Sequence, residues 1–149
     1  MIAVKAEDME KQVQYLVQNL DNFEHDKALK AGLRKGVNVF RVKGKSNLRA
    51  RIMGHGRQTG HLMNSFTTRV KRNKAGALAG FDRPGGNHSH LVDLGTVRRK
   101  TKKTGADRGV MPANRFWSDA QKSEAGKAMN AVYEGVKRAV ERLNERRNA

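Results

Sequence analysis

Cysteine is absent from the 149 residues of this chain, which excludes disulfide bridges, thiolate metal sites and cysteine nucleophiles. Aromatic residues supply only 5% of the sequence and hydrophobic residues 37%, so the hydrophobic core must be small. No apolar run approaches the roughly 20 residues that a membrane-spanning helix needs, and residues 1–11 lack the apolar centre of a secretion signal. Length and composition together predict one soluble domain without a membrane partner.

Acidic residues are also unevenly distributed. Residues 27–81 contain no Asp or Glu but hold 14 of the 31 Lys and Arg, within a formal net charge of +17. A second, denser basic cluster is opposed only by Asp107 and consists of Arg98, Arg99, Lys100, Lys102, Lys103 and Arg108. The first 26 residues are the reverse, with six acidic residues against two lysines. This asymmetry favours polyanionic or acidic partners, or head-to-tail contacts between identical subunits, and the alternative for residues 27–81 is a solvated face.

The N-terminal part of the chain has helical periodicity. Apolar spacing predicts a helical region over residues 8–53, broken near residues 19–22 by Asn and Asp and preceded by an N-terminal arm over residues 1–7. The predicted stripe of its second helix consists of Leu29, Leu33, Val37 and Phe40, extended in four-residue steps by Gly44, Leu48 and Ile52. Gly32, Gly36 and Gly44 each cost a helix about 1 kcal/mol relative to Ala. We therefore expect close packing or a kink at one of these glycines.

The remainder of the chain combines a hairpin, a loop and a second long helix. Residues 59–83 predict a β-hairpin, residues 88–94 fit either a helix or a strand, and residues 96–111 predict a long, basic, mobile loop. A C-terminal helix is predicted over residues 113–145, with Pro112 at its start. Its predicted stripe consists of Phe116, Ala120, Met129, Val132, Val136, Val140 and Leu143. The predicted fold class is α+β, a single domain with long N-terminal and C-terminal helices packed on a small antiparallel β-sheet.

No group of residues offers a catalytic centre. His88, His90 and Asp93 are the tightest group of potential metal ligands, but no second acidic cluster supplies the remaining ligands. A metal-dependent nuclease needs two or three convergent carboxylates, and the acidic residues between 82 and 119 fall in different predicted elements. The serines lack a nucleophile elbow, and the glycine-rich segments lack the Lys-Ser/Thr of a phosphate-binding loop. We therefore expect no enzyme, no metal and no cofactor.

A basic nucleic-acid-binding protein of the ribosomal or nucleoid type is a further interpretation. Non-specific binding requires Lys and Arg against phosphates, which this chain has in excess. Reading of RNA bases usually requires aromatic side chains between the basic residues, and residues 27–81 contain only Phe40, Phe66 and Phe81. Any nucleic-acid contact is therefore expected at backbone phosphates, with a steep dependence on salt.

Three segments, taken in order, resemble the tail-completion (head–tail joining) family of long-tailed bacteriophages. Thr59–Phe66 is similar to the family's T-G-x-L-x-x-S-[IF], His88–Thr96 to its Y-A-x-x-[VL]-E-[FY]-G-T, and Met111–Ala120 to its P-A-x-P-F-[LM]-x-x-A. A basic helix before the first segment also matches. The positions that carry the resemblance are Thr59, Gly60, Leu62, Ser65, Asp93, Gly95, Thr96, Pro112, Phe116 and Ala120.

The resemblance implies a virion structural protein without a catalytic centre. It implies a ring of this chain, a hexamer matched to the sixfold tail, at the virion neck on top of the tail, assembled in the host cytoplasm. The implied partners are a tail terminator or tail tube, head-side neck or connector proteins, and packaged DNA. Within this interpretation residues 96–111 form an assembly arm whose basic cluster meets DNA or an acidic protein face, and a tail-terminator role stays open.

The motif residues also have local interpretations. Thr59 and Gly60 are expected to turn the chain into the hairpin, and the Ser65 side chain to bond nearby backbone. Gly95 is expected to adopt a backbone conformation that a Cβ disfavours. The side chains predicted to be buried are Leu91, Val92 and Leu94 against the sheet and Phe116 as the anchor of the last helix, with Trp117 in the core or an interface.

Overall fold

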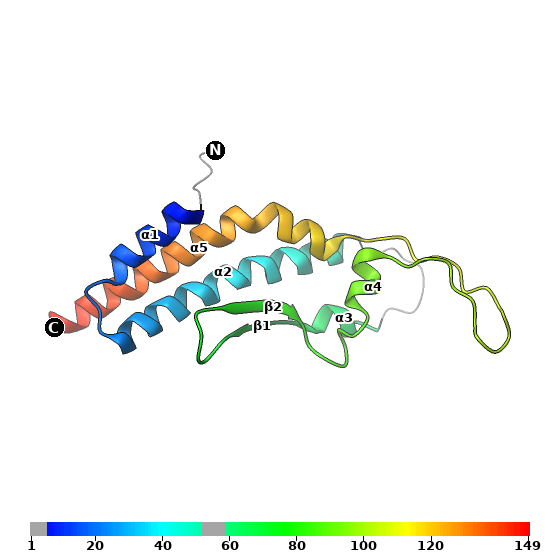
Figure 1. Ribbon diagram of the computed structural model, residues 1–149, viewed down its shortest axis with the longest axis horizontal. Coiled ribbons are helices and arrows are strands. Elements are labelled where there is room, and N and C mark those ends of the chain that lie inside the picture. Colours follow the sequence, from blue (N-terminus) through cyan, green and yellow to red (C-terminus); the bar gives the residue numbers. More distant parts are fainter. Residues whose placement is uncertain (1–5, 52–58) are drawn as a thin grey trace.

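The computed structural model describes residues 6–51 and 59–149 and contains five helices and one hairpin among them (Figure 1). In chain order the elements are α1 (Ala6–Val17), α2 (Asn22–Arg51), α3 (His61–Asn64), β1 (Phe66–Val70), β2 (Ala77–Phe81), α4 (Ser89–Leu94) and α5 (Phe116–Arg147). The fold class is α+β, as predicted. Residues 6 and 7 already belong to α1 and not to the predicted arm. Residues 1–5 of that arm and residues 52–53 of the predicted helical region lie outside the described residues.

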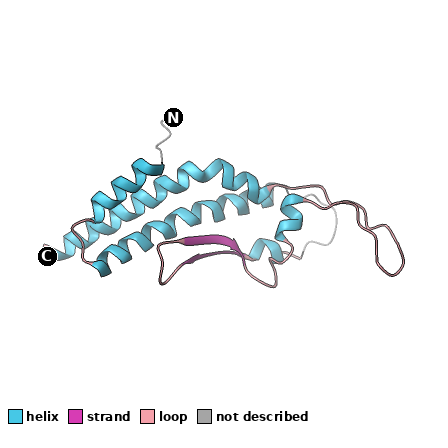
Figure 2. Cartoon of the chain, viewed as in Figure 1, coloured by secondary structure: helices cyan, strands magenta, loops and turns pink. Residues whose placement is uncertain are grey.

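The long helices α2 and α5 run side by side in opposite directions, and α2 also contacts both strands (Figure 2). α1 packs against α5. α2 begins at the predicted break, where the Asp21 carboxylate accepts the backbone N–H of Glu24 at 2.8 Å and thereby caps the helix. The α2–α5 pair is therefore the central layer of the molecule, with α1 and the sheet added to it.

Glycines bring the two long helices into unusually close contact. A Cβ on Gly32 would lie 2.5 Å from Cγ2 of Val136 and 2.6 Å from the backbone oxygen of Val132. Gly135 of α5 packs on the Cα of Gly32 in the same region. On the other half of α2, a Cβ on Gly44 would lie 2.6 Å from the Trp117 ring. The prediction of close packing at these glycines is confirmed.

The same contact corrects part of the predicted apolar stripes. The residues buried as predicted are Gly44 and Leu48 on α2 and Phe116, Ala120, Val136 and Val140 on α5. The buried residues of α2 are Ala28, Gly32, Gly36, Gly44 and Leu48. Leu29, Leu33, Val37 and Phe40 are only half-buried. On α5, the predicted Met129 is 39% exposed and its neighbour Ala128 is buried. The reason is that small residues let two backbones approach closely, so they and not the large side chains occupy the contact.

Two hydrophobic clusters lie at opposite ends of the helix pair. The first joins α1 to the pair and contains Val17, Ala28, Val136 and Val140. The second lies between α2, the hairpin and the start of α5, and contains Leu48, Phe66 and Phe116, with Phe81 and Trp117 packed against them. Phe116 is fully buried, as predicted, and Trp117 packs on the core side.

The hairpin is shorter than predicted. β1 and β2 pair antiparallel from Phe66 opposite Phe81 to Val70 opposite Ala77. Leu62 lies in the short helix α3 and not in the strand, because the positive φ of Gly60 (74°) turns the chain before it. Residues 88–94, which fitted either structure, contain the helix α4.

Candidate functional site

The three motif segments, distant in sequence, meet at one end of the α2–α5 pair. In the first segment the Ser65 hydroxyl donates to the backbone oxygen of Leu62 at 2.8 Å, and the Ser65 backbone oxygen accepts the N–H of Asp82 at 2.7 Å. Ser65 is buried, so its bond to nearby backbone is as predicted. The first segment is thereby fixed beside the chain that leads into α4.

Asp93 connects the second segment to the third. Its side chain is 6% exposed, and its Oδ1 accepts the backbone N–H of Trp117 at 2.7 Å and of Ser118 at 3.1 Å. The Ser118 hydroxyl donates to Oδ2. The carboxylate therefore satisfies backbone donors in the first turn of α5 and places a negative charge at the positive end of the helix. Asp93 is a cap for a helix that starts 23 residues later.

The last helix starts later than the predicted residue 113. α5 begins at Phe116, and Pro112 lies before the helix and not at its first position. The flanking residue Arg115 has a positive φ of 56° and makes no side-chain cap bond. The backbone oxygens of Val92 and Asp93 accept the N–H groups of Asn114 (3.0 Å) and Arg115 (2.8 Å), which join α4 to the chain before α5. Sequence reasoning missed the cap because the capping residue is remote.

A pair of hydrogen bonds closes the base of residues 96–111, hereafter the arm. The Thr96 N–H donates to the backbone oxygen of Met111 at 2.9 Å, and the Met111 N–H donates to Thr96 Oγ1 at 3.0 Å. Gly95 precedes this base with φ 76°, and a Cβ there would lie 2.7 Å from the Met111 oxygen. The prediction for Gly95 is confirmed, and the arm leaves the body at a fixed point.

Beyond its base the arm is an irregular hairpin that projects from the body (Figure 1). The Arg108 N–H donates to the Arg99 oxygen at 2.8 Å, and the Arg99 N–H donates to the Gly109 oxygen at 3.3 Å. Further out, the Thr101 N–H donates to the Ala106 oxygen at 3.0 Å. The sequence predicted a long loop for these residues. It did not predict the backbone hydrogen bonds between the two sides of the arm, because no residue pattern in the arm indicates them. Mobility of the arm stays a prediction.

The predicted basic cluster occupies the arm and is nearly uncompensated. Arg98 donates from Nε to Oδ2 of Asp107 at 2.8 Å. This bond, with the Gly109 N–H, holds the pKa of Asp107 below its ordinary value of 3.8. Among the described residues no carboxylate forms a salt bridge with the remaining cations, Arg99, Lys100, Lys102, Lys103 and Arg108. Repulsion between these five charges favours an anionic partner.

An apolar patch surrounds the base of the arm, which sequence reasoning missed. Val97 is 81% exposed and Val110 is 61% exposed, on the two sides of the hairpin. Leu94, predicted to be buried against the sheet, is 68% exposed. It stands at the end of α4, whose buried position is taken by Asp93. A cleft of about 440 Å³ opens beside it and is lined by Leu94, Ala113, Arg115, Ser118, Gln121 and Lys122.

The three motif segments form the part of the body from which the arm projects, hereafter the platform, and the other motif residues pack within it or border it. Phe116 and Ala120 are fully buried on α5, and Leu62 packs against the aromatic cluster of Phe66 and Phe116. Thr59 is exposed at the turn before α3. The structure thus brings the motif positions together at the foot of the arm, with the basic cluster beyond them.

The described residues were searched for groups of potential metal ligands and for helices that could span a membrane. Across residues 6–51 and 59–149, no group of three His, Asp or Glu side chains is placed to hold a metal ion. Asp93 uses both carboxylate oxygens on α5, away from the exposed His88 and His90. No helix in the described part of the chain is long and apolar enough to cross a membrane.

Comparisons with known proteins add no relative. No protein-family model matches the chain, and neither a curated protein nor a solved structure matches it at a significant level.

Proposed function

We propose that this chain is a phage virion structural protein, a tail-completion or head–tail connector component that forms a ring at the top of the tail and mediates head–tail joining. The observation that carries the proposal is the assembly of the three motif segments into one platform. Asp93 joins the second segment to the third, and the Phe66–Phe116 contact joins the first to the third. The contacts between the motif segments support a common role for them in this proposal, which is to position the arm.

In this proposal the arm docks on a neighbouring virion protein. The exposed side chains of Val97, Val110 and Leu94 need an apolar partner surface. The backbone of DNA offers no such surface, whereas an acidic protein face with an apolar centre matches both the patch and the five uncompensated cations. We therefore favour a protein partner, from the head-side connector or the tail, for the arm. The ring is a hexamer in this proposal, matched to the tail.

The test replaces the five uncompensated arm cations, Arg99, Lys100, Lys102, Lys103 and Arg108, by Gln in the phage that is proposed to encode the chain. These side chains are exposed, so the urea midpoint should stay unchanged, while joined particles fall at least tenfold and free heads and tails accumulate in electron micrographs. The matched control replaces five exposed cations elsewhere, Lys71, Arg72, Lys74, Lys137 and Arg138. Normal particle yields from the arm variant, or equal losses in the control, would contradict the proposal.

The second candidate function is non-specific nucleic-acid binding, which the five uncompensated arm cations favour. Base reading is disfavoured because the rings of Phe66 and Phe81 pack on each other in a tilted arrangement, with centroids 4.7 Å apart, in the core cluster. This candidate predicts DNA binding by a monomer with a steep salt slope, and the slope should fall when arm cations are removed. Fluorescence anisotropy with a DNA duplex of random sequence, at salt concentrations from about 50 to 300 mM, measures this dependence of the affinity on salt.

A further inference from the structure

One face of α2 carries a stripe of cations along most of the helix. Its members share this face because they stand seven or four residues apart, which is close to whole turns of an α-helix. From the first to the last the stripe covers about 33 Å, at 1.5 Å per residue. The members of this cationic stripe are Lys27, Arg34, Arg41, Lys45 and Arg49.

The cationic stripe has no internal counter-charge. Residues 27–81 contain no Asp or Glu, and among the described residues no carboxylate forms a salt bridge with a member of the stripe. The Arg41 side chain is held by a neutral group, since its Nε donates to Oδ1 of Asn38 at 3.0 Å. Four members are exposed and Lys45 is half-buried. The stripe therefore presents uncompensated positive charge to its surroundings.

α5 shows how this protein builds an exposed helix face whose charges compensate one another. The two helices are similar in length, with 32 residues in α5 and 30 in α2, but the exposed positions of α5 carry both signs. Glu134 stands four residues before Arg138, and Arg142 three residues before Glu145. These spacings place opposite charges side by side on a helix. The single sign of the α2 stripe therefore differs from the solvated face of its neighbour and indicates an anionic partner.

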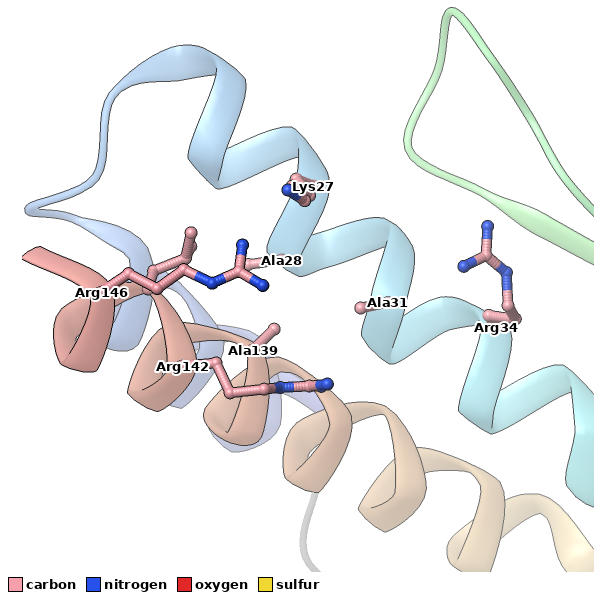
Figure 3. A pocket seen from close by; sticks show the side chains of 8 residues that line it. Lys27, Ala28, Ala31, Arg34, Ala139, Arg142 and Arg146 are labelled. Carbon is pink, nitrogen blue, oxygen red and sulfur yellow. The ribbon is translucent and has the colours of Figure 1, made fainter.

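Two cations of α5 extend the stripe at the end of the molecule opposite the arm. Arg142 and Arg146 line one side of a groove of about 300 Å³ between the two helices (Figure 3). Lys27 and Arg34 of the stripe line its other side. No carboxylate of the described residues lines this groove, so four cations from two helices gather around it. The remaining lining residues are Ala28, Ala31, Ala139 and Leu143.

The stripe fits a nucleic-acid duplex better than it fits a protein face. In residues 27–49, all of which the structure describes, Val42 is the one exposed large apolar side chain and no aromatic side chain is exposed. The centre of a protein interface is apolar, and the binding of single strands uses aromatic side chains that stack on bases. The phosphates of a duplex require only cations, and DNA offers about one charge per 1.7 Å of its axis. Each cation of the stripe can therefore meet a phosphate.

We propose that the cationic stripe of α2, together with Arg142 and Arg146, binds the phosphate backbone of duplex DNA. The site lies on the body of the protein and is separate from the arm, whose apolar patch fits a protein partner. Binding is independent of the base sequence, because contacts to phosphates carry no sequence information. This inference goes beyond the proposed function and does not require it, since a DNA contact along α2 leaves the arm free.

The test measures DNA binding by a stripe variant of the full chain, with fluorescence anisotropy on a duplex of random sequence at about 50 to 300 mM salt. Each phosphate contact contributes about 0.9 to the slope of log affinity against log salt, so the stripe variant should lose about 4 from that slope. A smaller variant with only Arg34→Gln and Arg41→Gln, both at exposed positions, should lose about 2. The substitutions of the stripe variant are Lys27→Gln, Arg34→Gln, Arg41→Gln, Lys45→Gln and Arg49→Gln.

The charge-matched control replaces the five uncompensated arm cations by Gln and should keep the parent slope. An unchanged slope in both stripe variants would overturn the DNA site, and an equal loss in the arm variant would overturn it in favour of the arm. Arg34→Lys with Arg41→Lys should bind as the parent does, because phosphates require charge and not the fork of a guanidinium. Polyglutamate at the same concentration of charge should not displace the duplex, and displacement would indicate an acidic protein face in place of DNA.

Discussion

Both ends of the α2–α5 pair have an apolar cluster, but the end that carries the arm is also tied by directed polar bonds to the start of α5. At the end covered by α1, Ala28, Val136 and Val140 pack in an apolar cluster beside the glycine contacts. At the arm end, polar groups make directed bonds to the start of α5, from Asp93 and from Arg51. Apolar packing is non-directional, whereas hydrogen bonds fix atoms in particular places. The comparison teaches that the polar end sets where the arm begins.

The largest effect should come from the glycine contact in the helix pair. Gly32→Val places a branched side chain against the backbone oxygen of Val132, 2.6 Å from the Cβ position, which cannot move without separating the helices. We expect a loss of about 3 kcal/mol or more in the free energy of unfolding, measured by urea denaturation.

The matched control for this prediction is Gly126→Ala on α5. A Cβ at Gly126 meets no atom within 4 Å, so the substitution should stabilise the helix by about 0.5–1 kcal/mol. If both glycine substitutions shift the urea midpoint in the same direction, the close contact of α2 and α5 is contradicted.

The second largest effect should come from the polar end. Asp93→Ala removes the acceptor for two backbone N–H groups of α5 and leaves them buried, which should cost about 1–3 kcal/mol. Asp93→Asn keeps one acceptor oxygen and should lose less. Hydrogen exchange should increase at Trp117 and Ser118 and across the base of the arm. Unchanged hydrogen exchange at the base of the arm would contradict the claim that the Asp93 cap fixes where the arm begins.

A smaller effect is expected at Arg51, which ties the end of α2 to the same junction. Its Nη1 donates to the backbone oxygen of Asn114 at 2.9 Å and pairs with Asp119 at 2.7 Å. The ion pair is more than one third exposed, so screening by water limits its contribution. Arg51→Gln should therefore lower the free energy of unfolding by about 0.5–1 kcal/mol, and a double-mutant cycle with Asp119→Asn checks the pairing.

The smallest effect is a pH dependence in the middle of α5. Burial raises the pKa of Glu124, but hydrogen bonds from Lys127 and Ser123 and the charge of Lys43 outweigh it, so the net pKa lies below the ordinary value of 4.5. A lowered folded-state pKa stabilises the fold above 4.5 and loses that contribution as the pH falls through the folded value. Urea midpoints should fall less between pH 6 and pH 3 (roughly spanning that value) in Glu124→Gln than in the parent chain.

The sequence predicted the helices better than their contacts. Helical periodicity identified both long helices, because apolar spacing is a local property. On α5 most of the predicted stripe is buried, but in the first half of α2 the predicted face is displaced, since Leu29 and Leu33 are more apolar than Ala28 and Gly32 but too large for helices at this separation. Which residues of the two helices are buried depends on how α5, α1 and the hairpin pack against them, and the periodicity of one helix does not reveal this.

The sequence indicated many residues of the candidate site but not the contacts that bring them together. The basic cluster and the motif positions are visible in the sequence, because both are stretches of neighbouring residues. The start of α5 was predicted at the wrong place because its cap, Asp93, lies on another element. The exposed patch of Val97, Val110 and Leu94 was missed, since periodicity treats each apolar residue as a core candidate.

The central claim is that this chain lies at the junction of head and tail and holds its arm against a neighbour there. The most direct measurement is immunogold labelling of purified particles of the phage that is proposed to encode the chain, with a short tag appended after Ala149 at the end remote from the arm. The account predicts gold at one position, between head and tail, and on the upper end of unjoined tails. Gold that is absent from the particles, or that follows nucleic acid in the lysate, would contradict it.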